Sequence, residues 1–362
     1  MNRNFFLFLV AAFLLPNVPN LQRNLWRKVC IAIDVARFNL VCRFQEPDMP
    51  PNEAHEGDPF APPIANVCAG ASSKRRNLLL IRHGESTMNA LSDWTSVGHG
   101  LRRELSSLFS DGTDSFFVDP PLTDEGARQA ASLGARLPTL LGGRNFTVMV
   151  SNMRRALETA HIALTQWQRA ARHRPAGESP TAFPLLHVDS DLEEIGCGGI
   201  SIGGAMPGPL ESSVVLRGAA ADLASFAPLE NGHSLREFIR ADGNLGGKHT
   251  LSARAWTRQD RFLNKLFSSS LFTDTDNNDD HVVVIFGHGI FYRWLVRRLD
   301  GLPDLHFPNA GSVGLRLVCD PTSGRPKLSS VEPHWSFRLF FSLPSVHCKT
   351  CVWMWLCFGM LL

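Results

Sequence analysis

Short apolar runs alternate with amphipathic segments along the middle of the chain. Three runs are rich in the branched side chains that are typical of strands buried on both faces of a parallel sheet. They lie at 77–81, 146–150 and 282–286. Helical spacing of apolar residues is found from 123 onward, at 154–169, at 251–267 and from 288 to about 301. The alternation predicts an α/β fold, a three-layer α/β/α sandwich with a mostly parallel central sheet, in which ligands bind at the carboxyl ends of the strands.

A helix start signal lies just before the first amphipathic segment. Thr123 is a preferred N-cap residue, and Asp124 with Glu125 would place negative charge in the first turn, where the helix dipole favours it. We therefore predict that a helix begins at Asp124.

The segments around this alternating region have different compositions. We predict that residues 1–73 are an N-terminal extension and linker, that 74–330 form the folded domain, and that 331–362 are an apolar C-terminal extension. Within the domain, residues of about 197–250 are rich in Gly, Ala, Pro and Ser, which favours an inserted lid. Only 234–241 has a helical pattern there.

The terminal segments do not determine the cellular compartment of the protein. The apolar run behind Arg3 has the length of a signal-peptide core and is too short to cross a bilayer, so residues 1–20 would be secretory, organelle-directing or a plain extension. Without a functional signal the protein would be cytoplasmic. With one it would be organelle-targeted, secreted or membrane-associated, and any membrane contact is expected through the termini.

Composition narrows the class of function. Of the 362 residues, 44% are hydrophobic and 19% are charged, which excludes wholesale disorder. The formal net charge is only +2, so the protein is not expected to bind nucleic acid. The 8 cysteines are scattered and do not settle the redox compartment. We expect no metal at Cys348 and Cys351, because no second pair or histidines lie at ligand spacing.

Basic side chains follow each of the three predicted strands. Arg82 and His83 come directly after the first strand, and His288 lies between two glycines after the last. The middle strand leads into Arg154 and Arg155 at a helix start, where neighbours point about 100° apart, so only one of them can easily face the site. Guanidinium and imidazole groups at one sheet edge suit an anion such as phosphate.

This order of motifs resembles the histidine phosphatase superfamily, in its phosphoglycerate mutase-like branch. The resemblance extends over about 74–318. The matching residues are Arg82-His83-Gly84-Glu85-Ser86 with Asn89, Asp119 and Pro121-Leu122-Thr123, Ser151 through Arg155-Ala156 to Thr159-Ala160, Leu192 with Glu194, Gly287-His288-Gly289, and Asn309 before Ser312. The resemblance implies a phosphoglycerate mutase-like fold and catalysis through phosphohistidine.

The resemblance also implies that His83 is the nucleophile, while Arg82, Arg155 and His288 hold the phosphoryl oxygens. These residue types suit the chemistry, because two guanidiniums and an imidazolium can neutralise a phosphate dianion without a metal or a cofactor. In-line attack needs an unprotonated nitrogen on His83. We therefore expect its other ring nitrogen to donate to a backbone carbonyl.

Two further site residues are implied in the same way. Glu194 stands at the position of the acid/base carboxylate, which would protonate the leaving alcohol and then activate water against phosphohistidine. Glu193 is adjacent, and the residues that follow depart from the family's pattern, so this match is looser. Asn89 matches an auxiliary position in the phosphate pocket.

The function implied is that of a metal-independent phosphomonoesterase. After Glu194 the chain has Ile195-Gly196-Cys197, where cofactor-dependent mutases usually carry Arg-His-Tyr, so mutase activity is not expected. The substrate would be a phosphorylated small molecule or a phosphoprotein. The sequence specifies neither the substrate nor the oligomeric state.

Three other functions fit parts of the sequence. A pseudophosphatase would keep the phosphate pocket as a phospho-ligand or protein-binding module without turnover, and the altered motif around Glu194 favours it. A metallohydrolase would use His83 and His288, although the chain lacks clustered metal-ligand spacing. A serine hydrolase would use Ser201, which lacks the flanking strand and helix that its motif requires.

Overall fold

The computed structural model describes residues 68, 74–90, 120–172, 184–194, 239–241, 255–268, 280–300 and 307–333. The predicted targeting segment, most of the predicted lid with Ser201, and the bulk of the C-terminal extension lie outside these residues. The domain boundaries therefore stay predictions. Within the described part, no helix combines the length and the apolar character that a bilayer crossing needs.

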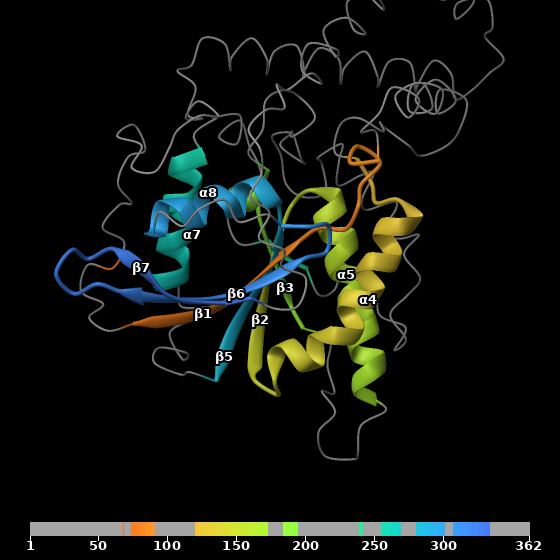
Figure 1. Cartoon of the computed structure of the whole chain (residues 1–362), viewed down its shortest axis with the longest axis horizontal. Helices are drawn as coiled ribbons and strands as arrows, with labels where there is room; N and C mark the ends of the chain where they lie inside the picture. Colours follow the sequence, from red (N-terminus) through yellow and green to blue (C-terminus); the bar gives the residue numbers. More distant parts are fainter. Residues whose placement is uncertain are drawn as a thin grey trace, which may run out of the picture.

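The described strands form one sheet (Figure 1). They are β1 Arg75–Arg82, β2 Asn145–Ser151, β3 Leu186–Asp189, β4 Ile239–Ala241, β5 His281–Gly287, β6 Ser312–Cys319 and β7 Pro326–Pro333. Their order in the sheet is β4-β3-β2-β5-β1-β6-β7. Neighbouring strands from β4 to β1 run parallel. Among the described strands, β6 pairs antiparallel with both β1 and β7. The prediction of a mostly parallel sheet is confirmed.

Helices cover both faces of the sheet. They are α4 Asp124–Leu141, α5 Arg154–Arg172, α7 Ala255–Ser268 and α8 Gly289–Asp300, with a 3-10 turn, η1, at Ser190–Leu192. Thr123 caps α4 as predicted, because its side chain accepts a hydrogen bond from the amide of Gly126. α4 and α5 lie on one face, whereas α7 and α8 lie on the other (Figure 1). The three-layer α/β/α architecture is confirmed.

The two apolar layers are built by alternate residues of the central strands. On β1, Leu79 and Ile81 pack in the layer of α4 and α5, whereas Leu78 and Leu80 pack in the layer of α7 and α8. A strand that is buried on both faces needs apolar side chains in both directions. This is why its sequence is a continuous apolar run.

One element differs from its prediction. The segment 234–241 has a helical pattern, but its described residues form β4, in which Ile239 is paired with Leu186 of β3. Hydrogen bonding to the edge of a sheet outweighs a weak local helix preference. The hydrophobic pattern also does not predict the strands β3, β6 and β7.

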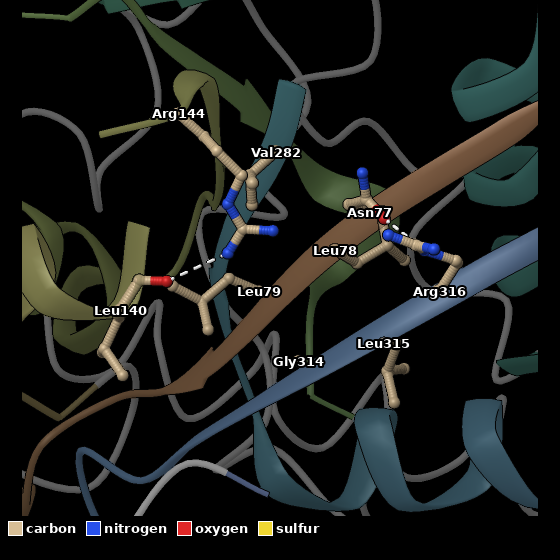
Figure 2. Close-up of a pocket in the computed structure, with 9 residues that line it drawn as sticks. All are labelled: Asn77, Leu78, Leu79, Leu140, Arg144, Val282, Gly314, Leu315 and Arg316. Carbon is tan, nitrogen blue, oxygen red and sulfur yellow. Dashed lines mark hydrogen bonds between the residues drawn. The ribbon is translucent and has the colours of Figure 1, made fainter. Parts of the chain in front are cut away.

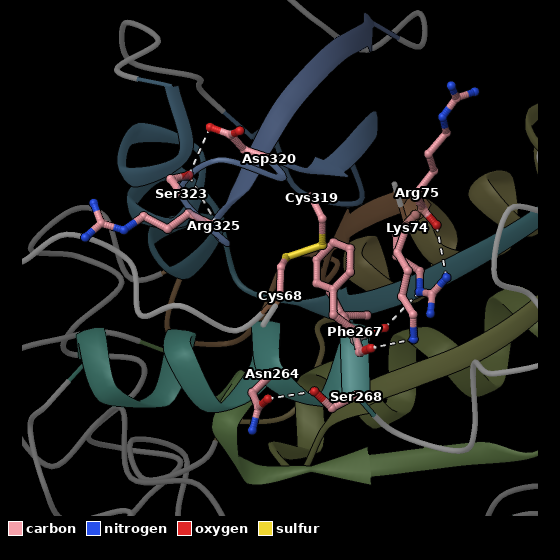
Figure 3. Close-up of a disulfide and its surroundings, with 12 residues drawn as sticks. Cys68, Lys74, Arg75, Asn264, Phe267, Ser268, Cys319, Asp320, Ser323 and Arg325 are labelled. Atoms are coloured by element: carbon pink, nitrogen blue, oxygen red, sulfur yellow. Dashed lines mark hydrogen bonds between the residues drawn. A yellow bond between two sulfur atoms is a disulfide. The ribbon is translucent and has the colours of Figure 1, made fainter. Parts of the chain in front are cut away.

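A disulfide joins Cys68 to Cys319 at the end of β6 (Figure 3), across a sequence separation of 251. Cys68 also donates its backbone N–H to the carbonyl of Gly324 at 2.9 Å. A residue of the predicted linker is therefore fastened to the turn between β6 and β7. The spacing of the cysteines could not reveal this pairing, because it depends on which Cα atoms the fold brings close together.

A small pocket lies between β1, β6 and the end of α4, toward the start of β1 (Figure 2). Its polar groups already bond each other or the backbone: Arg316 Nε donates to Asn77 Oδ1 at 2.9 Å, and Arg144 Nη2 donates to the carbonyl of Leu140 at 3.1 Å. The pocket contains none of the predicted site residues. Those residues lie at the other end of the strands.

Candidate functional site

The carboxyl ends of the parallel strands bring two histidines together. In the register of β1 and β5, Arg82 is paired with Gly287. His83 and His288 are the next residues along the chain, and the centroids of their rings lie 5.2 Å apart. The pairing of two strands that are distant in sequence therefore creates a pair of adjacent imidazoles.

The hydrogen bonds of His83 define its tautomer. Its Nδ1 lies 2.6 Å from the carbonyl oxygen of Gly84. Because a carbonyl can only accept, Nδ1 carries the proton. Its Nε2 accepts a hydrogen bond from Arg155 Nε at 3.0 Å. The unprotonated nitrogen of this buried ring thus faces a guanidinium group, and the expected donation to a backbone carbonyl is present.

The two adjacent arginines at the start of α5 point in different directions. Arg155 is 5% exposed and contacts His83, whereas Arg154 Nε donates to Glu158 Oε1 at 2.7 Å. The expectation that only one of them faces the site is confirmed, and that one is Arg155.

Arg82 approaches the site from the end of β1. Its Nη1 donates to the carbonyl of Phe307 at 2.6 Å, and its Nε has no hydrogen-bond partner among the described residues. Burial lowers the pKa of Arg82, and the carboxylate of Glu194 opposes that shift. A Cβ on Gly289 would lie 3.1 Å from Arg82 Cδ, so glycine lets the start of α8 come close to this side chain.

The loop after His83 is held against both helices of one face. Gly84 N donates to Thr159 Oγ1 of α5 at 3.0 Å, and Glu85 N donates to Gln129 Oε1 of α4 at 2.9 Å. A Cβ on Gly84 would lie 2.5 Å from the carbonyl oxygen of Gly126, closer than real Cβ contacts. Glycine at this position therefore permits the backbone contact that fixes the loop.

His288 is completely buried at the start of α8. Its carbonyl accepts the first helical hydrogen bond from Tyr292 N, so the positive end of the α8 dipole points at the site. Its Nε2 lies 2.9 Å from Ser151 Oγ. Its Nδ1 has no hydrogen-bond partner among the described residues and lies 3.9 Å from Glu194 Oε2. Nδ1 is therefore the ring nitrogen that remains available to a ligand.

The structure separates the two adjacent glutamates. Glu194 Oε1 accepts a hydrogen bond from Phe291 N at 3.2 Å, and its other oxygen lies near His288. Glu193 instead accepts from Asn152 Nδ2 at 2.7 Å. The carboxylate at the histidines is therefore that of Glu194, as the motif spacing favoured.

Asn89 has a different environment from the other predicted site residues. It is exposed, and its Oδ1 accepts from Ser86 N at 3.2 Å and from Ser86 Oγ at 3.0 Å. These contacts hold a local turn and do not join Asn89 to the histidines. Its role in the phosphate pocket stays a prediction.

The electrostatics of the site disfavour protonated histidines. Burial, and next the charge of Arg155, lower the pKa of His83 and of His288 well below their ordinary value of 6.5. Both rings are therefore neutral in the free protein at neutral pH. The imidazolium expected at His288 is not the state of the empty site, because a proton there would be buried beside guanidiniums.

Three potential metal ligands lie close together. One polar atom each of His83, Glu194 and His288 lies within 4.8 Å of the others. However, Nδ1 of His83 bonds a carbonyl, and its Nε2 accepts from Arg155. Guanidinium groups that face this cluster would repel a divalent cation and attract an anion. The donor set therefore fits a metal poorly.

Several residues that hold the site had no assigned role in the sequence. Ser151 bonds His288, and Thr159 accepts from Gly84 while it donates to the carbonyl of Arg155 at 2.7 Å. Both residues belong to the stretch that matches the family's pattern, from Ser151 to Thr159, and this stretch is the signal in the sequence that points to them. Arg258 on α7, whose Nη1 donates to the carbonyl of Glu193 at 2.7 Å, could not be connected to the site without the fold.

The family model that matches is the histidine phosphatase superfamily (branch 1), over residues 110–176. This span includes Arg155 and ends before His288. The match confirms, over that part of the chain, the resemblance drawn from the motifs. No curated protein matches the chain.

Three solved structures are similar at 18% sequence identity each. A mycobacterial glucosyl-3-phosphoglycerate phosphatase in complex with VO3 has a TM-score of 0.37, covering 72% of this chain and 100% of its own. A phosphoglycerate mutase from Bacillus anthracis has a TM-score of 0.37, with 72% and 93% covered. A phosphoserine phosphatase from Entamoeba histolytica, in complex with 3-phosphoglyceric acid, has a TM-score of 0.33, with 72% and 98% covered. These names describe the neighbours and are not transferred to this chain.

Proposed function

We propose that this protein is a metal-independent phosphomonoesterase that forms a phosphohistidine on His83. The proposal is carried by one observation: the unprotonated Nε2 of a buried imidazole faces the guanidinium of Arg155. A phosphate dianion bound by guanidiniums at this place would present its phosphorus atom to a neutral nucleophile. The match to the histidine phosphatase superfamily supports the same chemistry.

In the first half-reaction, the Nε2 lone pair of His83 attacks phosphorus and the bond to the leaving oxygen breaks. Arg82, Arg155 and the start of α8 bind the equatorial oxygens, where charge develops. The electron pair of the broken bond stays on the leaving oxygen. A protonated Glu194 gives that oxygen its proton, so an alcohol departs.

In the second half-reaction, water replaces the departed alcohol. The carboxylate of Glu194 takes a proton from this water as its oxygen attacks phosphorus, and the P–N bond breaks. The electron pair returns to Nε2 of His83, and inorganic phosphate is released. Transfer of the phosphoryl group to a second acceptor would give mutase activity, and we propose hydrolysis as the main outcome.

The substrate class we propose is a phosphorylated small molecule, with a phosphoprotein as the alternative. In this proposal the site binds only the phosphoryl group, which both classes of substrate carry. The names of two solved neighbours include phosphoglycerate compounds, which makes phosphorylated small acids a reasonable first set to assay.

Binding of an inorganic dianion is expected to take up a proton from solution. In the free site the pKa of His288 is lowered by burial, and then by Arg155. A dianion beside the ring favours the charged form, so it raises this pKa and the complex holds more protons than the free protein. Affinity for the dianion should therefore rise as pH falls from about 7 toward 5. Sulfate is a suitable probe, since its own charge does not change in this range.

Calorimetric titration with sulfate in two buffers of different ionisation enthalpy measures the proton uptake. Uptake should approach one proton per sulfate at pH values between the two pKa values of His288, and His288→Asn should lower it clearly. Uptake that is zero in the wild type or unchanged in this variant would contradict the assignment.

Turnover of p-nitrophenyl phosphate by the full chain, with EDTA present, tests the proposed function. We expect turnover to persist under chelation and acid-labile phosphate to be trapped on the protein. Loss of activity with EDTA would favour a metallohydrolase instead. Binding of sulfate without any turnover would favour the pseudophosphatase.

A further inference from the structure

A buried arginine of α7 holds the backbone that carries Glu194. Arg258 is 4% exposed, and its Nη1 donates to the carbonyl of Glu193 at 2.7 Å. Its Nη2 donates to the carbonyl of Glu194 at 3.4 Å. One planar guanidinium therefore bridges two successive peptide carbonyls. A lysine ammonium cannot reproduce this fork geometry.

Further along α7, two more cations hold the segment just before Glu194. Arg261 Nη2 lies 2.6 Å from Asp191 Oδ1, and Lys265 Nζ lies 2.7 Å from Asp189 Oδ2. The three basic residues occur at helical spacings of three and four, so they lie on one face of α7. That face runs along the whole turn from β3 to Glu194.

The side chain of Glu194 is fixed at its far end by another element. Phe291 N of α8 donates to Oε1, while Oε2 lies 3.9 Å from His288 Nδ1. The carboxylate is thus set by two points, the α8 amide at its oxygens and the Arg258 fork at its backbone. If the fork is removed, the carboxylate can drift from the leaving group. A misplacement of about 1 Å can cost about a hundredfold in rate.

We infer that Arg258 is a positioning residue, which holds Glu194 where it can exchange a proton with the leaving group and then with water. The inference deepens the proposed function and rests on it. Arg258 would act through the backbone carbonyls of Glu193 and Glu194, and the substrate phosphate would not touch it. Replacement of Arg258 should therefore slow proton transfer and leave the affinity for phosphate unchanged.

Two substrates with different leaving groups separate these effects. p-Nitrophenolate departs without a proton, whereas the more basic phenolate from phenyl phosphate needs one. Arg258→Lys keeps the buried charge and loses the fork. We expect it to lower kcat/KM for phenyl phosphate about 10- to 100-fold more than for p-nitrophenyl phosphate, with sulfate affinity unchanged. Glu194→Gln should show the same selective loss, and the double variant should lose little more than Glu194→Gln alone.

Arg298→Lys is the matched control. Arg298 is an arginine of α8 with a buried side chain, and its Nη2 donates to Asp260 Oδ1 of α7 at 2.9 Å, so it joins α8 to α7 through Asp260. This variant should change kcat/KM for the two substrates by the same factor. Circular dichroism checks the folding of each variant. Arg258→Lys is the variant used because it retains a cation at this buried position and therefore does not leave the site without its charge.

The outcomes separate the two proposals. Equal losses for both substrates in Arg258→Lys, or losses that add to those of Glu194→Gln, overturn the positioning role. A large loss of sulfate affinity does so as well, because it makes Arg258 a phosphate ligand. If the wild type shows neither turnover nor acid-labile phosphate, the proposed function fails. If the wild type turns over and Glu194→Gln alone shows the selective loss, only the inference on Arg258 fails.

Discussion

His83→Asn is expected to lower the turnover of p-nitrophenyl phosphate by roughly 10⁴-fold, comparable to the loss of a catalytic nucleophile elsewhere. Asparagine can keep a polar contact with the Gly84 carbonyl, but it has no ring nitrogen that can form a P–N bond. The variant should therefore also carry no acid-labile phosphate after incubation with substrate. Steady-state kinetics and acid-quench trapping measure the two losses.

His281→Asn is the matched control for this variant. His281 begins β5, at the opposite end of the strand from His288, and its Nε2 lies 3.0 Å from Thr147 Oγ1. Its replacement should leave turnover within about threefold of the wild type, as expected for a substitution far from the site. Trapped phosphate that survives in His83→Asn would show that another residue is the nucleophile.

Arg155→Ala is expected to lower kcat/KM by at least about a hundredfold, or roughly 3 kcal/mol of transition-state stabilisation. The guanidinium contacts His83 and would move its hydrogen bonds to the phosphoryl oxygens when substrate binds. The charge of Arg155 also lowers the pKa of His83. Without it, this pKa rises toward 6.5, so the acid limb of the pH–rate profile should move to higher pH.

Arg154→Ala provides the comparison, because it removes the same side chain one position earlier. Arg154 forms an ion pair with Glu158 within α5, at 2.7 Å. Because Glu158 is buried, removal of this charged partner should lower the stability of the fold. Both kcat/KM and the pH profile of the folded variant should stay nearly unchanged. Equal losses of kcat/KM in the two variants would show that the contact of Arg155 with His83 does not contribute specifically to catalysis.

The strands that carry the site could be predicted because their sequences are almost entirely apolar. A strand buried on both faces, like β1 or β5, has a continuous apolar run, and the residue after it is then placed at the sheet edge. This is how Arg82, His83 and His288 were found. The start of α4 at Asp124 could likewise be predicted, because Thr123 is a preferred N-cap residue.

The remaining features depend on contacts between distant segments. β4 has a helical local pattern, and only its pairing with β3 shows its conformation. The neutral state of His288 follows from the burial of its ring, and next from the charge of Arg155, neither of which can be read from sequence spacing. The motif spacing favours Glu194 over Glu193 as the carboxylate at the histidines. Only the contact between Glu194 and Phe291 of α8 shows that this side chain lies there.

The disulfide of Cys68 and Cys319 has a consequence for how the site assembles. It closes a ring that spans 251 positions and includes every residue of the site, from Arg82 to His288. In the oxidised chain the ends of this ring cannot separate, even when the protein is unfolded. Less chain entropy is then lost when β1 meets β5, because the unfolded ensemble is already restricted. Reduction would open the ring, so the thiol–disulfide balance of the surroundings sets how readily an unfolded chain regains its paired histidines.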